Sequence, residues 1–297
     1  MKQPKYYIEH LCIYDTKPRE TMWNFLKWAH SIPQYYWGED VLISEDDNVA
    51  SDYTFLACGS KFSVQLEAPM PRLQFKYERD WFDTHPRGIN HVCYLVDNAL
   101  DSYNQLKAAG CEFAQHYTEF PPYNGFVAKD FEDVWIEIME YKMPETFKVP
   151  YMEPRYHSFE KLRMFGPVIL CRDLGAQEKF YQDVMGFKSA FRNVTDNQGV
   201  IYMIDTRYNV DDNNIAIQLK TPTIAPEKAL FEKYGPYIST IAYLSGDVEF
   251  AYQRALRAEF ESISAPAVDE LSGAETAWLR EPNGNLIEIR EEWKPGQ

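Results

Sequence analysis

Four polar residues of the chain, His10, Gln65, His91 and Glu137, have the side chains of a divalent-metal site. Two neutral imidazoles, one carboxylate and one amide oxygen suit a borderline divalent ion and leave coordination positions for water or a substrate. Such an ion would offset negative charge that develops on a substrate oxygen. The residue types therefore predict metal-dependent chemistry, provided that the fold brings the four side chains together.

Short strand-like segments that recur along the chain would position these residues. Each segment alternates apolar residues, ends near an Asp and precedes an amphipathic stretch with helical spacing. The four segments are IEHLCIYD from Ile8, INHVCYLVD from Ile89, FGPVILCRD from Phe165 and ISTIAYLSGD from Ile238. Two of the helical stretches stop at Gly110 and Gly186, as expected for a left-handed C-cap.

Each predicted helix is followed by two or three strand-like runs, and the last run of each set has a common shape: KFSVQLEAP, DVWIEIMEY, NIAIQLKTP and GNLIEIREE. Aligning these runs gives one column of polar residues: Gln65, Glu137, Gln218 and Glu288. The opening strands give a second column, 46 to 55 residues earlier: His10, His91, Pro167 and Thr240. Four units of nearly equal length predict an α+β fold of four βαβββ modules, paired into two half-barrel domains.

The columns also predict where the side chains point. Alternate side chains of a strand face the same way, so we expect His10 to share a face with Ile8 and Cys12. If each module curls into a half-barrel, its first and last strands present the column residues to the concave face. Two facing modules would then bring the four polar residues of the N-terminal half together.

Each of these residues also has an ordinary structural interpretation. A lone His on an alternating strand is more often a core or rim residue than a ligand, and Gln65 alone would be a routine buried hydrogen-bonding group. Glu137 is flanked by Trp135, Ile136 and Ile138, where an ionised carboxylate is costly unless it is paired or metal-bound. The occurrence of four polar residues in two repeat columns favours the metal site.

The C-terminal half offers an internal comparison, with Pro167, Gln218, Thr240 and Glu288 in the same columns. Proline cannot ligate and threonine is a poor ligand, so we predict that this half holds no metal. We expect it to complete the fold, shape a cavity or form an interface. Glu288 should then be neutralised by a nearby Arg such as Arg290, or reach solvent.

The boundary between the halves is predicted in the segment Lys142–Glu160, which contains prolines and no clear periodicity. We assign residues 1–145 to a metal-bearing module pair, 146–160 to a linker and 161–297 to a second module pair without metal. Pairing of modules between the two chains of a homodimer stays open as an alternative to pairing within one chain.

Charge and composition exclude several classes of partner. A net charge of −15 and a pI of about 4.9 argue against nucleic acid and anionic membrane surfaces. No secretory signal and no apolar run of the ~18 residues needed to span a bilayer are present. The 5 cysteines show no CxxC spacing and suggest free thiols in the cytoplasm. An aromatic share of 15% indicates aromatic-lined interiors or an apolar ligand cavity.

The chain resembles the vicinal oxygen chelate superfamily, which includes glyoxalase I, methylmalonyl-CoA epimerase, the extradiol dioxygenases and bleomycin-resistance proteins. The resemblance is carried by IEHLCIYD, by GINHVCYLVDNALDSYNQLKAAG with its downstream VWIEIMEY, and by EPNGNLIEIRE. It covers nearly the whole chain as a tandem four-module member. It is specific for the fold and much less so for the reaction, because one scaffold hosts several chemistries.

The resemblance implies three functions. The set His10, Gln65, His91 and Glu137 resembles the ligand sets of methylmalonyl-CoA epimerase and glyoxalase I, which favours an isomerase, epimerase or lyase acting on a small oxygenated substrate. An Fe(II) dioxygenase that cleaves a catechol-like aromatic is the second, although such enzymes usually carry the site in the C-terminal half. A non-catalytic, resistance-type binding protein is the third. One divalent ion is expected, and Fe, Zn, Co, Ni and Mn are all compatible with these ligands.

Three further residues are candidates for proton transfer. Glu45 lies on the predicted second strand of the first module, among acidic neighbours. His116 and Tyr123 precede the last strands of the second module and are expected to line the mouth of the cavity. Each also has a plain structural or solvated interpretation, because a base must lie within hydrogen-bond reach of the proton that it removes.

Overall fold

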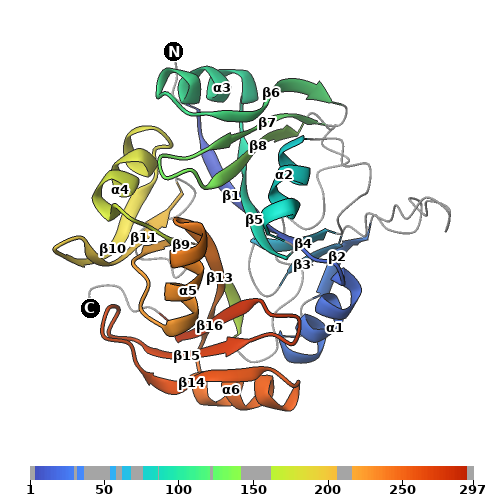
Figure 1. The fold of residues 1–297 in the computed structure, drawn as a ribbon, viewed down its shortest axis with the longest axis vertical. Coiled ribbons are helices and arrows are strands. Elements are labelled where there is room, and N and C mark those ends of the chain that lie inside the picture. The colour runs from blue at the N-terminus through green and yellow to red at the C-terminus, as the bar shows by residue number, and fades with distance from the viewer. Residues whose placement is uncertain are drawn as a thin grey trace.

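The structure is a computed structural model of the 297-residue chain, and it describes residues 4–29, 32–36, 54–57, 62–67, 76–85, 87–120, 123–141, 162–205 and 216–292. In these ranges the chain forms two eight-stranded sheets (Figure 1). None of the helices in the same ranges combines the length and the apolar character needed to cross a bilayer. The predicted linker, residues 146–160, lies outside the described residues.

The first sheet contains two βαβββ modules joined by a helix. The first module consists of β1 (Tyr6–Tyr14), α1 (Pro18–Ala29), β2 (Ile32–Tyr36), β3 (Thr54–Ala57) and β4 (Ser63–Glu67). After α2 (Lys76–Thr84), the second module consists of β5 (Gly88–Val96), α3 (Ala99–Ala108), β6 (Phe113–Phe120), β7 (Tyr123–Lys129) and β8 (Trp135–Tyr141). The strand order is β2-β3-β4-β1-β5-β8-β7-β6, with β1 and β5 antiparallel at the centre. The two modules therefore pair within one chain.

The second sheet repeats this plan. Its first module consists of β9 (Arg163–Leu170), α4 (Leu174–Asp183), β10 (Lys188–Thr195), β11 (Gln198–Ile204) and β12 (Ile217–Lys220). After α5 (Ala225–Tyr234), the next consists of β13 (Tyr237–Ser245), α6 (Val248–Arg257), β14 (Glu261–Val268), β15 (Glu275–Arg280) and β16 (Leu286–Glu291). The order β10-β11-β12-β9-β13-β16-β15-β14 matches that of the first sheet. The predicted α+β fold of four βαβββ modules is confirmed.

Short polar side chains at the ends of the opening strands start the helices that follow. The side chain of Asn98 accepts a hydrogen bond from the backbone N–H of Asp101 at the start of α3. Asp173 and Asp247 make the corresponding contact at α4 and α6, so the acidic end of the repeated motif is a helix cap. The glycines that follow α3 and α4 have positive φ angles, as the predicted left-handed C-caps require.

The central strand β1 carries a β-bulge beside its histidine. The pairing of β1 with β5 shifts register between Ile8 and His10, which makes Glu9 the extra residue. The expectation that Ile8 and His10 share a face is therefore wrong. Ile8 packs into the main hydrophobic core, whereas Cys12 packs with Tyr14 in a separate cluster. The bulge places His10 on the same side of the sheet as His91 and Glu137 of the second module.

One hydrophobic cluster runs through both halves of the chain. Trp28 of α1 lies in this cluster, and its Nε1 donates a hydrogen bond to the backbone oxygen of Ala251 in α6 at 3.1 Å. The Trp28 ring packs against Tyr243 of β13 with centroids 4.7 Å apart. The hydroxyls of Tyr94 and Tyr181 meet at 3.2 Å between the other two modules. Shared core packing thus fixes the halves against each other.

Candidate metal centre

The four predicted ligands lie on four neighbouring strands of the first sheet. Gln65 is on β4, His10 on β1, His91 on β5 and Glu137 on β8, and these strands are adjacent in the order β4-β1-β5-β8. The first and last strands of each module lie at the centre of the sheet. The residues of the two sequence columns therefore lie side by side on four adjacent strands. The topology explains why residues 127 positions apart in sequence, from His10 to Glu137, converge.

Ligand atoms of His10, His91 and Glu137 lie within 4.8 Å of one another. The Nε2 atoms of the two histidines are 3.7 Å and 3.4 Å from Oε2 of Glu137. These separations exceed the usual N–H···O distance of about 2.7–3.2 Å. They fit ligand atoms around one shared ion, since bonds of about 2.1 Å separate neighbouring ligands by roughly 3–4 Å. The donor set and its spacing therefore fit a divalent ion.

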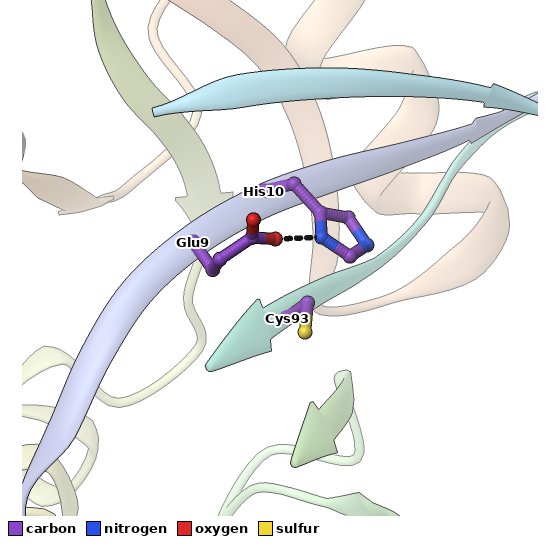
Figure 2. A group of neighbouring side chains, drawn as sticks. All are labelled: Glu9, His10 and Cys93. Carbon is purple, nitrogen blue, oxygen red and sulfur yellow. Dashed lines mark hydrogen bonds and ion pairs between the residues drawn. The ribbon is translucent and has the colours of Figure 1, made fainter. Parts of the chain in front are cut away.

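The other ring nitrogen of each histidine is held by the residue that precedes it. Figure 2 shows the carboxylate of Glu9 directed at Nδ1 of His10, with the thiol of Cys93 from the neighbouring strand beside them. Nδ1 of His91 lies 2.6 Å from Oδ1 of Asn90. Because a neutral imidazole that donates through Nδ1 carries its lone pair on Nε2, both contacts leave Nε2 ready to bind a cation.

Burial of the group is uneven. The side chains of His10 and His91 are 2% and 4% exposed, whereas that of Glu137 is 22% exposed. An ion at this position would thus be enclosed by the imidazoles and accessible beside the carboxylate. A catalytic metal site needs such an open position, because water or substrate completes its coordination.

Burial and neighbouring charges shift the pKa values of three side chains in this group. Burial alone would raise the pKa of Glu137, but the imidazoles of His91 and His10 outweigh it and hold that pKa below its ordinary value. Burial opposes protonation of His10, yet the carboxylate of Glu9 raises the pKa of His10 above its ordinary value. Burial, with Glu137 and Glu9 nearby, raises the pKa of the Cys93 thiol. These shifts keep the carboxylate of Glu137 ionised and the thiol of Cys93 protonated at neutral pH.

Gln65 lies beside this group. The residue is 8% exposed, and its amide lies close enough to His10 to help raise the pKa of that imidazole. Its backbone pairs with Cys12 in the parallel ladder between β1 and β4. The amide is therefore in position to add a neutral oxygen ligand to the two imidazoles and the carboxylate.

The three candidates for proton transfer lie in different parts of the chain. Glu45 lies outside the described residues. Tyr123 is the first residue of β7. His116 lies on the edge strand β6, where its Nδ1 is 2.8 Å from the hydroxyl of Tyr103 on α3 and its ring stacks on Phe113. The structure does not bring His116 to the metal group.

In the C-terminal half, a guanidinium lies among the column residues. Nη1 of Arg290 is 3.1 Å from Oε1 of Gln218 and 3.4 Å from Oε1 of Glu288. The guanidinium also lies over the ring of Tyr202, 4.7 Å from its centroid. The expectation that Arg290 neutralises Glu288 is confirmed. Within the described residues, the groups of His, Cys, Asp and Glu with metal-ligand spacing lie in the N-terminal half.

A cavity of about 220 Å³ lies at the junction of the halves, and none of the four predicted ligands lines it. The rings of Trp81, Trp135 and Tyr237 line it, and so do Arg172 of the C-terminal half and Asn90, the residue before His91. An aromatic lining with a few polar groups is typical of small-molecule pockets. The high aromatic content of the sequence is in part explained by this cavity.

Glu9 and Asn90 lie in the site but were not predicted from the sequence. Both are 2% exposed, and both contact the Nδ1 of the histidine that follows. The available signal was a polar residue immediately before each column histidine in IEHLC and INHVC. Strict alternation assigns such a residue to the opposite face, so only the bulge reveals the contact.

Comparison with known families matches residues 164–289 to the Glyoxalase/Bleomycin resistance protein/Dioxygenase superfamily. Several solved structures share the fold over almost the whole chain. A mutant of 4-hydroxymandelate synthase from Streptomyces coelicolor has a TM-score of 0.69 and 12% identity, covering 99% of this chain and 95% of its own. No curated protein matches the chain in sequence.

Two further solved structures with the same fold differ in the reaction that they are named for. The 2,3-dioxygenase LapB from Pseudomonas sp. KL28 has a TM-score of 0.61 and 12% identity, covering 99% of this chain and 95% of its own. The Mn(II)-bound glyoxalase from Novosphingobium aromaticivorans has a TM-score of 0.58 and 15% identity, covering 97% and 83%. At these identities the likeness concerns the fold alone.

Proposed function

Because this chain belongs to the Glyoxalase/Bleomycin resistance protein/Dioxygenase superfamily, matched through residues 164–289, we propose that it is a metal-dependent enzyme whose active site lies in its N-terminal half. His10, His91 and Glu137, with Gln65 as a fourth ligand, would hold one divalent ion. The chemistry that such an ion supplies when bound is Lewis-acid stabilisation of negative charge on substrate oxygens. The observation that carries the proposal is the convergence of three ligand atoms within 4.8 Å.

The residues of the site have separate tasks in this proposal. The nearly buried imidazoles of His10 and His91 exclude water from one side, and the exposed edge beside Glu137 admits the substrate. Glu137 stays ionised at neutral pH because the two histidines lower its pKa. A small substrate with adjacent oxygens would then bind at the open positions, as the vicinal oxygen chelate resemblance implies.

We propose an isomerase, epimerase or lyase as the reaction class. Gln65 supports it, because a neutral amide beside His10 would complete a four-ligand set of two imidazoles, one amide and one carboxylate. Removal of a proton next to a carbonyl needs a base within hydrogen-bond reach. His116, on the edge strand, contacts Tyr103 of α3, so Glu45 and Tyr123 remain as the candidate bases from the sequence.

An Fe(II) dioxygenase is the second candidate function. Two histidines and one carboxylate are the ligand set of many non-haem Fe(II) oxygenases, and His10, His91 and Glu137 form such a set. The cavity at the junction of the halves, lined by Trp81 and Trp135, would suit an aromatic substrate. Structures similar in fold include a 2,3-dioxygenase and a catechol 2,3-dioxygenase.

Two assays on metal-reconstituted protein separate these functions. Oxygen uptake with Fe(II) and catechol would support the dioxygenase. Exchange of a substrate carbon-bound proton for deuterium from solvent, with Zn(II), Co(II), Ni(II) or Mn(II) and without oxygen uptake, would support the isomerase or lyase. In either case His91→Ala should abolish turnover. Ligand binding that survives this substitution, with no turnover in either assay, would instead indicate the resistance-type binding protein.

A further inference from the structure

We infer that Glu9 and Asn90 are unequal positioning residues for the two histidine ligands, and that Glu9 makes His10 the stronger ligand. The inference rests on the proposed function, because it assigns these residues a role toward the ion held by His10 and His91. It goes further by naming two residues outside the ligand set and by ranking their effects on metal affinity.

The backbone places the two residues in the same way. The register between β1 and β5 shifts at Glu9, and it shifts again where Cys12 pairs with His91 and Ile13 with Ile89. Asn90 is the extra residue at this second shift. A regular strand would send the residue before a ligand to the opposite face of the sheet. A bulge in each strand instead lets it reach the ligand's Nδ1.

The two contacts differ in charge. Glu9 presents a carboxylate to Nδ1 of His10, and Asn90 presents a neutral amide oxygen to Nδ1 of His91 at 2.6 Å. Either acceptor fixes the tautomer with the lone pair on Nε2. A carboxylate acceptor also raises the electron density of the imidazole, which strengthens its bond to a metal. His10 should therefore be the stronger of the two ligands.

The charge balance of the site points the same way. Glu9 is 2% exposed, and within the described part of the chain its ion-pair partner is His10. The Cys93 thiol lies within 4.8 Å of the same two side chains and carries no positive charge. Glu9 and Glu137 together bring two negative charges to the group, which one divalent cation would neutralise. Without Glu9 the group would carry a single carboxylate, that of Glu137.

The test is an exchange of the charge between the two positions. The variants are Glu9→Gln, Asn90→Asp and the double variant Glu9→Gln with Asn90→Asp. Gln keeps an acceptor for Nδ1 and removes only the charge, and Asp adds a charge at the matching position. Dissociation constants of Zn(II) and Co(II) are measured at pH 8 on chelator-stripped protein by competition with a chromophoric chelator. The Co(II) absorption spectrum reports the ligand geometry without any assay of activity.

We expect Glu9→Gln to weaken metal binding about 10- to 100-fold, the usual effect of losing an outer-shell partner. Asn90→Asp should strengthen binding by about tenfold, and the double variant should return to within about threefold of the unsubstituted protein. The matched control is Glu281→Gln, a buried carboxylate of the other half that accepts a hydrogen bond from Asn24, and it should leave affinity unchanged.

A merely structural role would give a different pattern. Both single substitutions would then weaken binding or leave it unchanged, and the double variant would be no better than the worse of them, which would overturn the inference. If Glu9→Gln does not fold, weaker binding in Asn90→Asp alone overturns it. Failure of the unsubstituted protein to bind Zn(II) or Co(II) would refute the proposed function itself, a result distinguishable from a failure of the ranking.

Discussion

The guanidinium of Arg290 lies 3.4 Å from the carboxylate of Glu288, on the strand of the C-terminal half that corresponds to β8, which carries Glu137. Glu288 occupies the column of Glu137, and Arg290 follows it by two residues on the same face of β16. Both side chains are nearly buried, at 3% and 2% exposure. The cation that the N-terminal half would take from solution is here supplied by the chain itself.

Replacement of Arg290 should destabilise the protein strongly. Arg290→Met leaves Glu288 buried without its cation, and breaking a buried pair from one side costs about 3–5 kcal/mol of unfolding free energy. Urea unfolding followed by circular dichroism measures this change. The double variant Arg290→Met with Glu288→Met should recover most of the loss, since it removes both charges. A double variant as unstable as the single one would show that the pair does not act as a unit.

The junction of the halves should make stability depend on pH through Asp130. Burial raises the pKa of Asp130 to about 7, even though the side chain of Gln177 donates a hydrogen bond to it at 2.5 Å. The unfolded carboxyl titrates near pH 4, so the folded state holds the proton more tightly. The contribution of Asp130 is complete below about pH 4 and is lost as pH rises to about 7. Unfolding free energy should fall over this window.

Asp130→Asn isolates this effect from other titrating groups, among them Glu132, which lies two residues away and accepts hydrogen bonds from the backbone N–H groups of Arg172 and Asp173. The variant keeps the shape of the side chain and cannot ionise. Its melting temperature relative to the unsubstituted protein should therefore rise progressively between about pH 4 and pH 7. A difference between the two proteins that stays constant across this range would contradict the assignment.

Trp28 should contribute far more to the free energy of unfolding than its neighbour Trp23 on the same helix. Trp28 is fully buried between the halves and donates a hydrogen bond to Ala251, whereas Trp23 is 58% exposed. Trp28→Ala should cost about 3–5 kcal/mol in urea unfolding, because it opens a cavity in the shared core. Trp23→Ala should change the free energy by less than about 0.5 kcal/mol. Equal effects of the two substitutions would contradict the shared core.

The repeat explains why the fold and the convergence of the candidate ligands could be predicted from the sequence. Strand periodicity and two columns of polar residues reveal module length and order, and the column residues His10 and His91 lie on the paired strands β1 and β5. The connecting helices were not predicted. The segment that forms α2 is short, acidic and preceded by prolines, and tertiary packing of Trp81 against Tyr14 stabilises it.

The direction of individual side chains was the part that the sequence did not predict. A two-residue period assigns Ile8 and His10 to one face, and the bulge at Glu9 separates them. The same bulge makes Glu9 a partner of His10, which no periodicity argument would propose. Side-chain hydrogen bonds between elements far apart in the sequence, such as that from Gln177 to Asp130, could not be predicted either.

The most direct test of the central claim is the metal content of the purified protein, measured by elemental mass spectrometry on protein prepared without a metal-binding tag. We predict about one divalent ion per chain, lost in His91→Ala and retained in His116→Ala, whose side chain lies away from the ligand group. Absence of any bound divalent ion, even after reconstitution of correctly folded protein, would contradict the account.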